Sequence, residues 1–113
     1  MIKIYHNPRC RKSRETLEII RQAGHEPEIV EYLINPPSEA ELEDMLRKMN
    51  KKPEEIIRKG EDIFKSNYKG ETFTDEEWIH ILVENPKLIE RPIVINGDKV
   101  ALGRPPESVK NIL

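Results

Sequence analysis

The chain contains one cysteine, Cys10, in the segment H-N-P-R-C-R-K-S-R. Within it, Cys10 follows a turn at Pro8 and precedes residues with helical spacing. The first N–H groups of a helix have no partners within the helix and carry the positive end of its dipole, so a sulfur there is stabilised as thiolate. Ser13 can add a hydrogen bond from its hydroxyl. We therefore predict a lowered pKa for Cys10, which makes it a nucleophile at neutral pH.

The charges around Cys10 support this prediction. Every charged residue before Glu15 is basic, although the formal net charge of the chain is −2. These residues are Lys3, Arg9, Arg11, Lys12 and Arg14. Two simpler interpretations remain open: Cys10 is a small buried residue, or the basic residues form a solvated helix face. The polar neighbours of Cys10 favour a reactive thiol over a buried one.

The composition limits the other functions. One cysteine cannot form an internal disulfide or a multi-cysteine zinc site. We expect no metal site and no bound cofactor. A net charge of −2 does not favour nucleic-acid binding. No apolar run approaches the roughly 20 residues of a membrane span, so we expect a cytoplasmic protein without membrane contact. A chain of 113 residues is expected to form a single domain, residues 1–113, and to be a monomer.

The hydrophobic pattern predicts the elements that position Cys10. Residues 1–5 and 28–33 have strand composition, and residues 11–23 between them have helical spacing. A helical insertion over about residues 38–85 follows, with capping boxes at Ser38 and Thr74. Residues 92–95 and 99–102 flank an Asn-Gly turn, and a last helix begins near Pro105. The order β-α-β, helical insertion, β-β-α predicts an α/β fold with one sheet.

Two arginines stand at element boundaries near the end of the chain. Arg91 precedes Pro92 before a predicted strand, and Arg104 precedes Pro105 before the last helix. A guanidinium group presents a planar fork of donors that matches a tetrahedral oxyanion. Arginines beside prolines are also common on surfaces, so this pattern alone leaves both interpretations open.

Taken together, three segments carry a resemblance to a known family: I-Y-H-N-P-R-C-R-K-S-R, I-I-R-K-G around Arg58, and E-R-P-I-V-I followed by L-G-R-P. In these segments, and in element order over essentially the whole chain, the sequence resembles the glutaredoxin-coupled arsenate reductases. That resemblance implies a thioredoxin-like mixed sheet with a helical insertion. It also implies that Cys10 is the nucleophile, that glutathione is the co-substrate and that glutaredoxin is the partner.

The resemblance implies roles for further residues. Arg58, Arg91 and Arg104 are expected to bind arsenate or a similar oxyanion, and Pro92 to be cis beside Cys10. His6 and Asn7 either orient the thiol or shape the turn. Ser13 stands where dithiol relatives have a resolving cysteine, so the second thiol must come from another molecule.

Two alternatives share the expected fold. One is a glutathione-dependent thiol-disulfide oxidoreductase of unknown substrate, and the other is a regulator that binds RNA polymerase and senses oxidants through a cysteine pair. Ser13 argues against the regulator, because one cysteine cannot form an internal disulfide. The arginines favour the reductase, because a disulfide exchanger does not need all of them beside the thiol.

Overall fold

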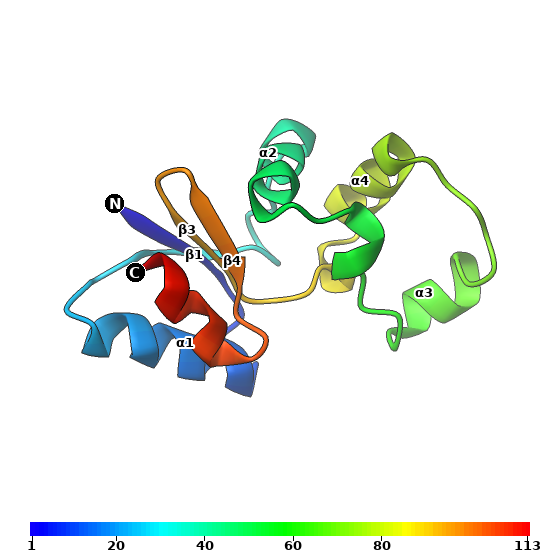
Figure 1. The fold of residues 1–113 in the computed structure, drawn as a ribbon. Helices are drawn as coiled ribbons and strands as arrows, with labels where there is room; N and C mark the ends of the chain where they lie inside the picture. The colour runs from blue at the N-terminus through cyan, green and yellow to red at the C-terminus, as the bar shows by residue number, and fades with distance from the viewer. The chain divides into compact units, whose positions relative to one another are not determined.

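A computed structural model describes residues 1–113 and divides the chain into two compact units. The first unit contains Met1–Asn35 with Arg91–Leu113, and the second contains Pro36–Glu90 (Figure 1). The position of one unit relative to the other is not determined, so each is described by itself.

The first unit is built on a four-stranded sheet with the strand order β2-β1-β3-β4. The strands are β1 (Ile2–His6), β2 (Glu28–Glu31), β3 (Ile93–Asn96) and β4 (Lys99–Leu102). β1 and β2 are parallel, and helix α1 (Arg11–Gln22) forms the crossover connection that a parallel pair requires. β1 and β3 are antiparallel, as are β3 and β4, whose hairpin turns at Gly97 with φ +62°. The predicted mixed sheet is confirmed.

The hydrophobic core of this unit lies between the sheet and two helical elements. α1 packs beside η3 (Pro106–Ile112), a 3-10 helix that also contacts β4 (Figure 1). The core residues come from β1, α1, β3 and η3, and are Ile2, Ile4, Leu17, Ile20, Val94 and Val109. We predicted a final helix, and the structure has a 3-10 helix there. Its side-chain spacing explains this form. Its period of three residues places Pro106, Val109 and Ile112 on one face, and the first two are buried.

The second strand is shorter than its composition predicts. We expected it to reach Leu33, but it ends at Glu31. Its parallel partner β1 ends at His6, which pairs with Glu31, so the residues after Glu31 have no neighbouring backbone to extend the ladder. The N–H groups of Ile34 and Asn35 donate instead to the Glu31 carbonyl, at 3.0 and 2.9 Å, and turn the chain.

The register of the sheet brings four chain segments to one edge. β1 and β2 run parallel and end together, so the loop after His6 and the turn after Glu31 leave the same edge. β3 runs antiparallel and begins there, because Ile93 pairs with Tyr5. β4 ends at Leu102, which pairs with Ile93. The segments containing Cys10, Tyr32, Arg91 and Arg104 therefore gather at this edge, which we call the Cys10 edge.

The second unit is helical. It contains α2 (Glu39–Met49), η1 (Pro53–Ile56), α3 (Asp62–Asn67), α4 (Asp75–Glu84) and η2 (Pro86–Leu88). Both predicted capping boxes are present, with Ser38 and Thr74 accepting from the backbone N–H of Glu41 and Glu77. Trp78 packs against the rings of Phe64, Tyr68 and Phe73, with the Phe73 ring centroid at 4.8 Å.

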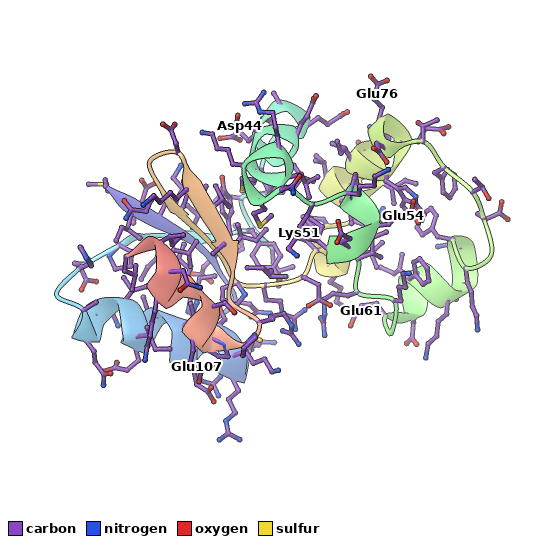
Figure 2. All side chains as sticks on the ribbon, viewed as in Figure 1. Asp44, Lys51, Glu54, Glu61, Glu76 and Glu107 are labelled. Atoms are coloured by element: carbon purple, nitrogen blue, oxygen red, sulfur yellow. The ribbon has the colours of Figure 1, made fainter.

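The surface of both units is strongly charged. Glu76 on α4 and Glu107 on η3 are exposed (Figure 2). None of the helices is long and apolar enough to cross a membrane.

Candidate functional site

Cys10 lies at the start of α1, as predicted. It is the N-cap residue of that helix, with an extended backbone at φ −93° and ψ 122°. Its N–H donates to the Asn7 carbonyl at 3.0 Å, which closes the turn after β1, and its carbonyl accepts from the N–H of Arg14 at 3.0 Å. The thiol is free and half-buried. The backbone thus aims the sulfur at the unpaired N–H groups of the first helical turn.

Burial of the sulfur raises the pKa of Cys10, but the surrounding groups outweigh this effect and the pKa is lowered. The largest lowering effects come from the backbone N–H of Ser13, the Arg91 guanidinium and the backbone N–H of Lys12. Helix N–H groups and a cation both favour the charged form of a thiol. The first turn of α1 contains no acidic residue that would oppose them.

The lowered pKa predicts the pH dependence of thiol alkylation. Iodoacetamide reacts with the thiolate, so the rate should rise with pH and reach half its maximum below pH about 8.5, the value of an unperturbed cysteine. The reaction is quenched at fixed times from pH 5 to 10, and the fraction of carbamidomethylated protein is measured by mass spectrometry. The rates obtained in this way give the midpoint. A midpoint at or above 8.5 would contradict the electrostatic account.

His6, Asn7 and Ser13 form a buried hydrogen-bonded network under the Cys10 turn. The Ser13 hydroxyl lies 2.6 Å from His6 Nδ1 and accepts from the backbone N–H of Asn7 at 3.1 Å. The Asn7 side-chain oxygen accepts from the N–H of Arg9 at 3.0 Å. Burial lowers the pKa of His6, so its ring is neutral at pH 7 and adds no positive charge beside the sulfur. The hydrogen bonds of all three residues hold the turn.

Two expectations about the thiol differ in detail from the structure. We expected the Ser13 hydroxyl to bond the sulfur, but that hydroxyl is engaged with His6 and Asn7, and the backbone N–H of Ser13 acts on the sulfur instead. We also expected the neighbouring basic residues to raise the local potential. Their side chains are exposed to solvent, which screens them, and Arg11 pairs with Glu15 at 2.8 Å. The cation that acts most strongly on Cys10 is Arg91, which is distant in sequence.

Arg91 and Arg104 meet at the Cys10 edge. Nη1 of Arg104 donates to the backbone carbonyl of Arg91 at 3.1 Å, so the second arginine supports the segment that carries the first. The Arg91–Pro92 peptide bond is cis, as expected, and the Arg104–Pro105 bond, for which no cis form was predicted, is cis as well. Both arginine residues are half-buried.

Gly103 marks a close approach between three parts of this edge. Its N–H donates to the Pro92 carbonyl at 2.9 Å. A Cβ atom on Gly103 would lie 2.7 Å from the Thr16 hydroxyl oxygen and 2.8 Å from Pro92 Cγ. Thr16 is fully buried and its hydroxyl donates to the Lys12 carbonyl at 2.8 Å, so it has no free space to move into. Glycine is therefore required beside Arg104 for steric reasons.

Gly103→Ala is expected to lower the free energy of unfolding by about 1 to 3 kcal/mol, the usual cost of overpacking a tight site. Urea unfolding followed by circular dichroism measures this change. Gly60→Ala is the matched control, because a Cβ on Gly60 meets nothing within 4 Å. Equal free energies of unfolding for the two variants would show that the segment around Gly103 can shift to accept a methyl group without loss of stability.

Tyr32 is a residue of this edge that was not predicted from the sequence, because residues 28–33 were expected to form a strand. It directly follows β2, is only 2% exposed, and its hydroxyl has no hydrogen-bond partner. Burial raises the pKa of this hydroxyl most strongly, while Arg91 lowers it and the charge of Cys10 raises it. One signal in the sequence could have identified Tyr32. It is an aromatic residue with a polar hydroxyl, and it stands just after the strand that pairs parallel with β1.

Arg58 lies in the second unit, after η1. Its N–H donates to the Leu88 carbonyl at 2.7 Å and its side chain pairs with Glu61 at 3.3 Å; Glu61 is labelled in Figure 2. The approach of Arg58 to Cys10 stays a prediction, because the two residues belong to different units.

The sheet order and the cysteine at the start of the first helix define a thiol protein of the thioredoxin-like fold class. An arsenate reductase structure from Vibrio cholerae superposes with a TM-score of 0.94 at 38% identity, covering 99% of this chain and 97% of that one. The ArsC family pattern matches residues 5–112. The chain therefore belongs to the ArsC family.

Two bacterial relatives are similar over almost all of this chain. The uncharacterized protein YfgD of Escherichia coli (strain K12) is 46% identical over 99% of this chain and 96% of its own length. An arsenate reductase of Rhizobium meliloti (strain 1021) is 44% identical over 99% of this chain and 81% of its own length.

Proposed function

We propose that this protein is an arsenate reductase that uses Cys10 as its nucleophile, glutathione as co-substrate and glutaredoxin as partner. The observation that carries the proposal is a half-buried thiol at a helix start, with a pKa lowered by helix N–H groups and Arg91, in a chain of the ArsC family. Arsenate reductases at about 40% identity, such as that of Rhizobium meliloti, support the oxidoreductase class.

The proposed reaction begins at the sulfur. The Cys10 thiolate attacks arsenic and forms an S–As bond, while one arsenate oxygen leaves as hydroxide or water. Arg91 is the guanidinium nearest this chemistry, since its charge already lowers the pKa of the thiol. It neutralises the oxygens of the adduct, with Arg104 and Arg58 as the further oxyanion-binding arginines.

The second half of the reaction requires an external thiol, because Cys10 is the only cysteine. Glutathione attacks the adduct, and two thiol sulfurs supply the two electrons that reduce arsenic(V) to arsenic(III). Arsenite leaves, and the two sulfurs remain as a mixed disulfide between Cys10 and glutathione. Glutaredoxin resolves that disulfide by thiol–disulfide exchange and restores the Cys10 thiol.

A coupled assay tests the proposal. Arsenate, glutathione, glutaredoxin, glutathione reductase and NADPH are mixed with the purified protein, and NADPH oxidation is followed with arsenite measured as product. We expect turnover that depends on arsenate, on glutathione and on glutaredoxin. Absence of arsenite above the background without enzyme would overturn the proposal.

The same assay distinguishes arsenate reduction from the alternative activity, glutathione-dependent thiol-disulfide exchange. A small mixed disulfide of glutathione replaces arsenate in a parallel reaction. Turnover of this disulfide without any turnover of arsenate would support the glutathione-dependent thiol-disulfide oxidoreductase instead.

A further inference from the structure

The Tyr32 hydroxyl is a buried polar group that lacks a partner. Its side chain is 2% exposed, and its oxygen neither reaches solvent nor makes a hydrogen bond. A buried hydroxyl without a partner loses its bonds to water and receives none in return, which destabilises the folded state. Such groups are uncommon in native proteins, and one at a functional site suggests that a ligand completes it.

The register of the sheet places Tyr32 at the Cys10 edge. The parallel strands β1 and β2 end at the paired residues His6 and Glu31, so Asn7 and Tyr32 directly follow the two strand ends. Arg91 arrives at the same edge from the start of β3. Burial has the largest effect on the pKa of the Tyr32 hydroxyl, and Arg91, Cys10 and Asn7 also act on it, in accord with this arrangement. None of these groups meets hydrogen-bond geometry with the hydroxyl.

A second buried donor at this edge also lacks a partner. It is Nε of Arg91, whose N–H can only donate. A tyrosine hydroxyl is protonated at neutral pH, and burial raises the pKa of Tyr32 further, so this group can donate as well. Two unpartnered donors beside a nucleophilic thiol match a ligand that is rich in acceptor oxygens.

The ligand oxygens fit better than the sulfur as the acceptor for Tyr32. The hydroxyl makes no hydrogen bond to Cys10 in the free protein. The thiolate is already stabilised by the N–H groups of Ser13 and Lys12. When a tetrahedral oxyanion is attached to the sulfur, its oxygens lie farther out than the sulfur and can accept a hydrogen bond from the Tyr32 hydroxyl.

We propose that the Tyr32 hydroxyl and Arg91 Nε together donate hydrogen bonds to the oxygens of a tetrahedral oxyanion bound at Cys10. The assignment rests on the proposed function and adds Tyr32 to its substrate-binding residues. Tyr32 selects for acceptor oxygens and takes no part in activating the thiol.

Protection of Cys10 from alkylation tests this assignment without requiring turnover. The rate of iodoacetamide modification is measured at increasing concentrations of arsenate, without glutathione, in the wild type and in Tyr32→Phe. We expect Tyr32→Phe to need a roughly tenfold higher arsenate concentration for half-maximal protection, as for a lost hydrogen bond to a charged acceptor. The alkylation rate without arsenate, and its pH midpoint, should equal those of the wild type.

Two controls show whether the effect belongs to the Tyr32 hydroxyl. Tyr68→Phe also removes one hydroxyl, which accepts from the Asn85 amide at 3.4 Å, and should leave protection unchanged. Tyr32→Phe should have a Tm equal to or above that of the wild type, because it removes an unpaired buried group.

Unchanged protection in Tyr32→Phe would overturn the assignment. A raised pH midpoint for alkylation in that variant would also overturn it, because Tyr32 would then act on the sulfur. Failure of the proposed function has a different signature: a wild-type thiol that arsenate protects in a protein that releases no arsenite. A wild-type thiol that arsenate does not protect would overturn both.

Discussion

Cys10→Ser is expected to lower arsenate reduction by at least about three orders of magnitude, to the background of the coupled assay. A serine hydroxyl is not ionised at neutral pH, so it cannot form the bond to arsenic that begins the reaction. Its oxygen also cannot enter a disulfide, so the electrons for arsenic have no route through the enzyme. Arsenite release in the coupled assay measures the loss.

The same variant distinguishes lost chemistry from lost folding. Cys10 is the N-cap of α1 and makes no side-chain capping hydrogen bond, whereas serine is among the preferred N-cap residues. The variant should therefore have a Tm equal to or above that of the wild type. Turnover within tenfold of the wild type would show that Cys10 is not the nucleophile.

Arg91→Ala has the second largest expected effect, because Arg91 acts on both the thiol and the substrate. Removing the guanidinium should raise the pKa of Cys10, so the alkylation midpoint moves to higher pH. It should also remove charge-assisted hydrogen bonds to the oxyanion. Together these losses are expected to lower kcat/KM for arsenate about a hundredfold, and the coupled assay together with the alkylation profile measures both.

Two further variants identify the cause of the Arg91 effect. Arg91→Lys keeps the charge but not the planar fork, so we expect a smaller shift of the thiol pKa while arsenate affinity still falls. Arg47→Ala removes an exposed arginine of α2 that pairs with Asp44, and should change neither quantity. An alkylation midpoint that is the same in Arg91→Ala and the wild type would show that Arg91 does not stabilise the thiolate.

Features that depend on interactions between residues close together in the sequence were predicted correctly. The capping boxes at Ser38 and Thr74, the start of α1 at Cys10 and the turn at Gly97 were all predicted. Each depends on residues within about four positions of one another, so the signal is complete in the local sequence. The lowered pKa of Cys10 was predicted for the same reason, since the helix N–H groups are local.

Errors arose where residues outside the predicted helix or strand itself decide the outcome. The strand predicted to reach Leu33 ends at Glu31, because its partner β1 ends at His6. The Ser13 hydroxyl was expected to bond the sulfur but is held by His6 and Asn7. In both cases the local residue types allow more than one arrangement, and packing selects one of them.

By itself, then, the sequence predicted a cysteine with a lowered pKa at a helix start, and it determined the β-α-β and β-β-α order of the elements. Only the tertiary structure decided which residues surround that cysteine. The sheet register brings Arg91 beside the thiol in place of the exposed basic neighbours, and it places the unpaired hydroxyl of Tyr32 at the same edge. The physical reason is that charge and hydrogen bonding act over a few ångströms of space, and strand pairing sets that spacing between residues far apart in the chain.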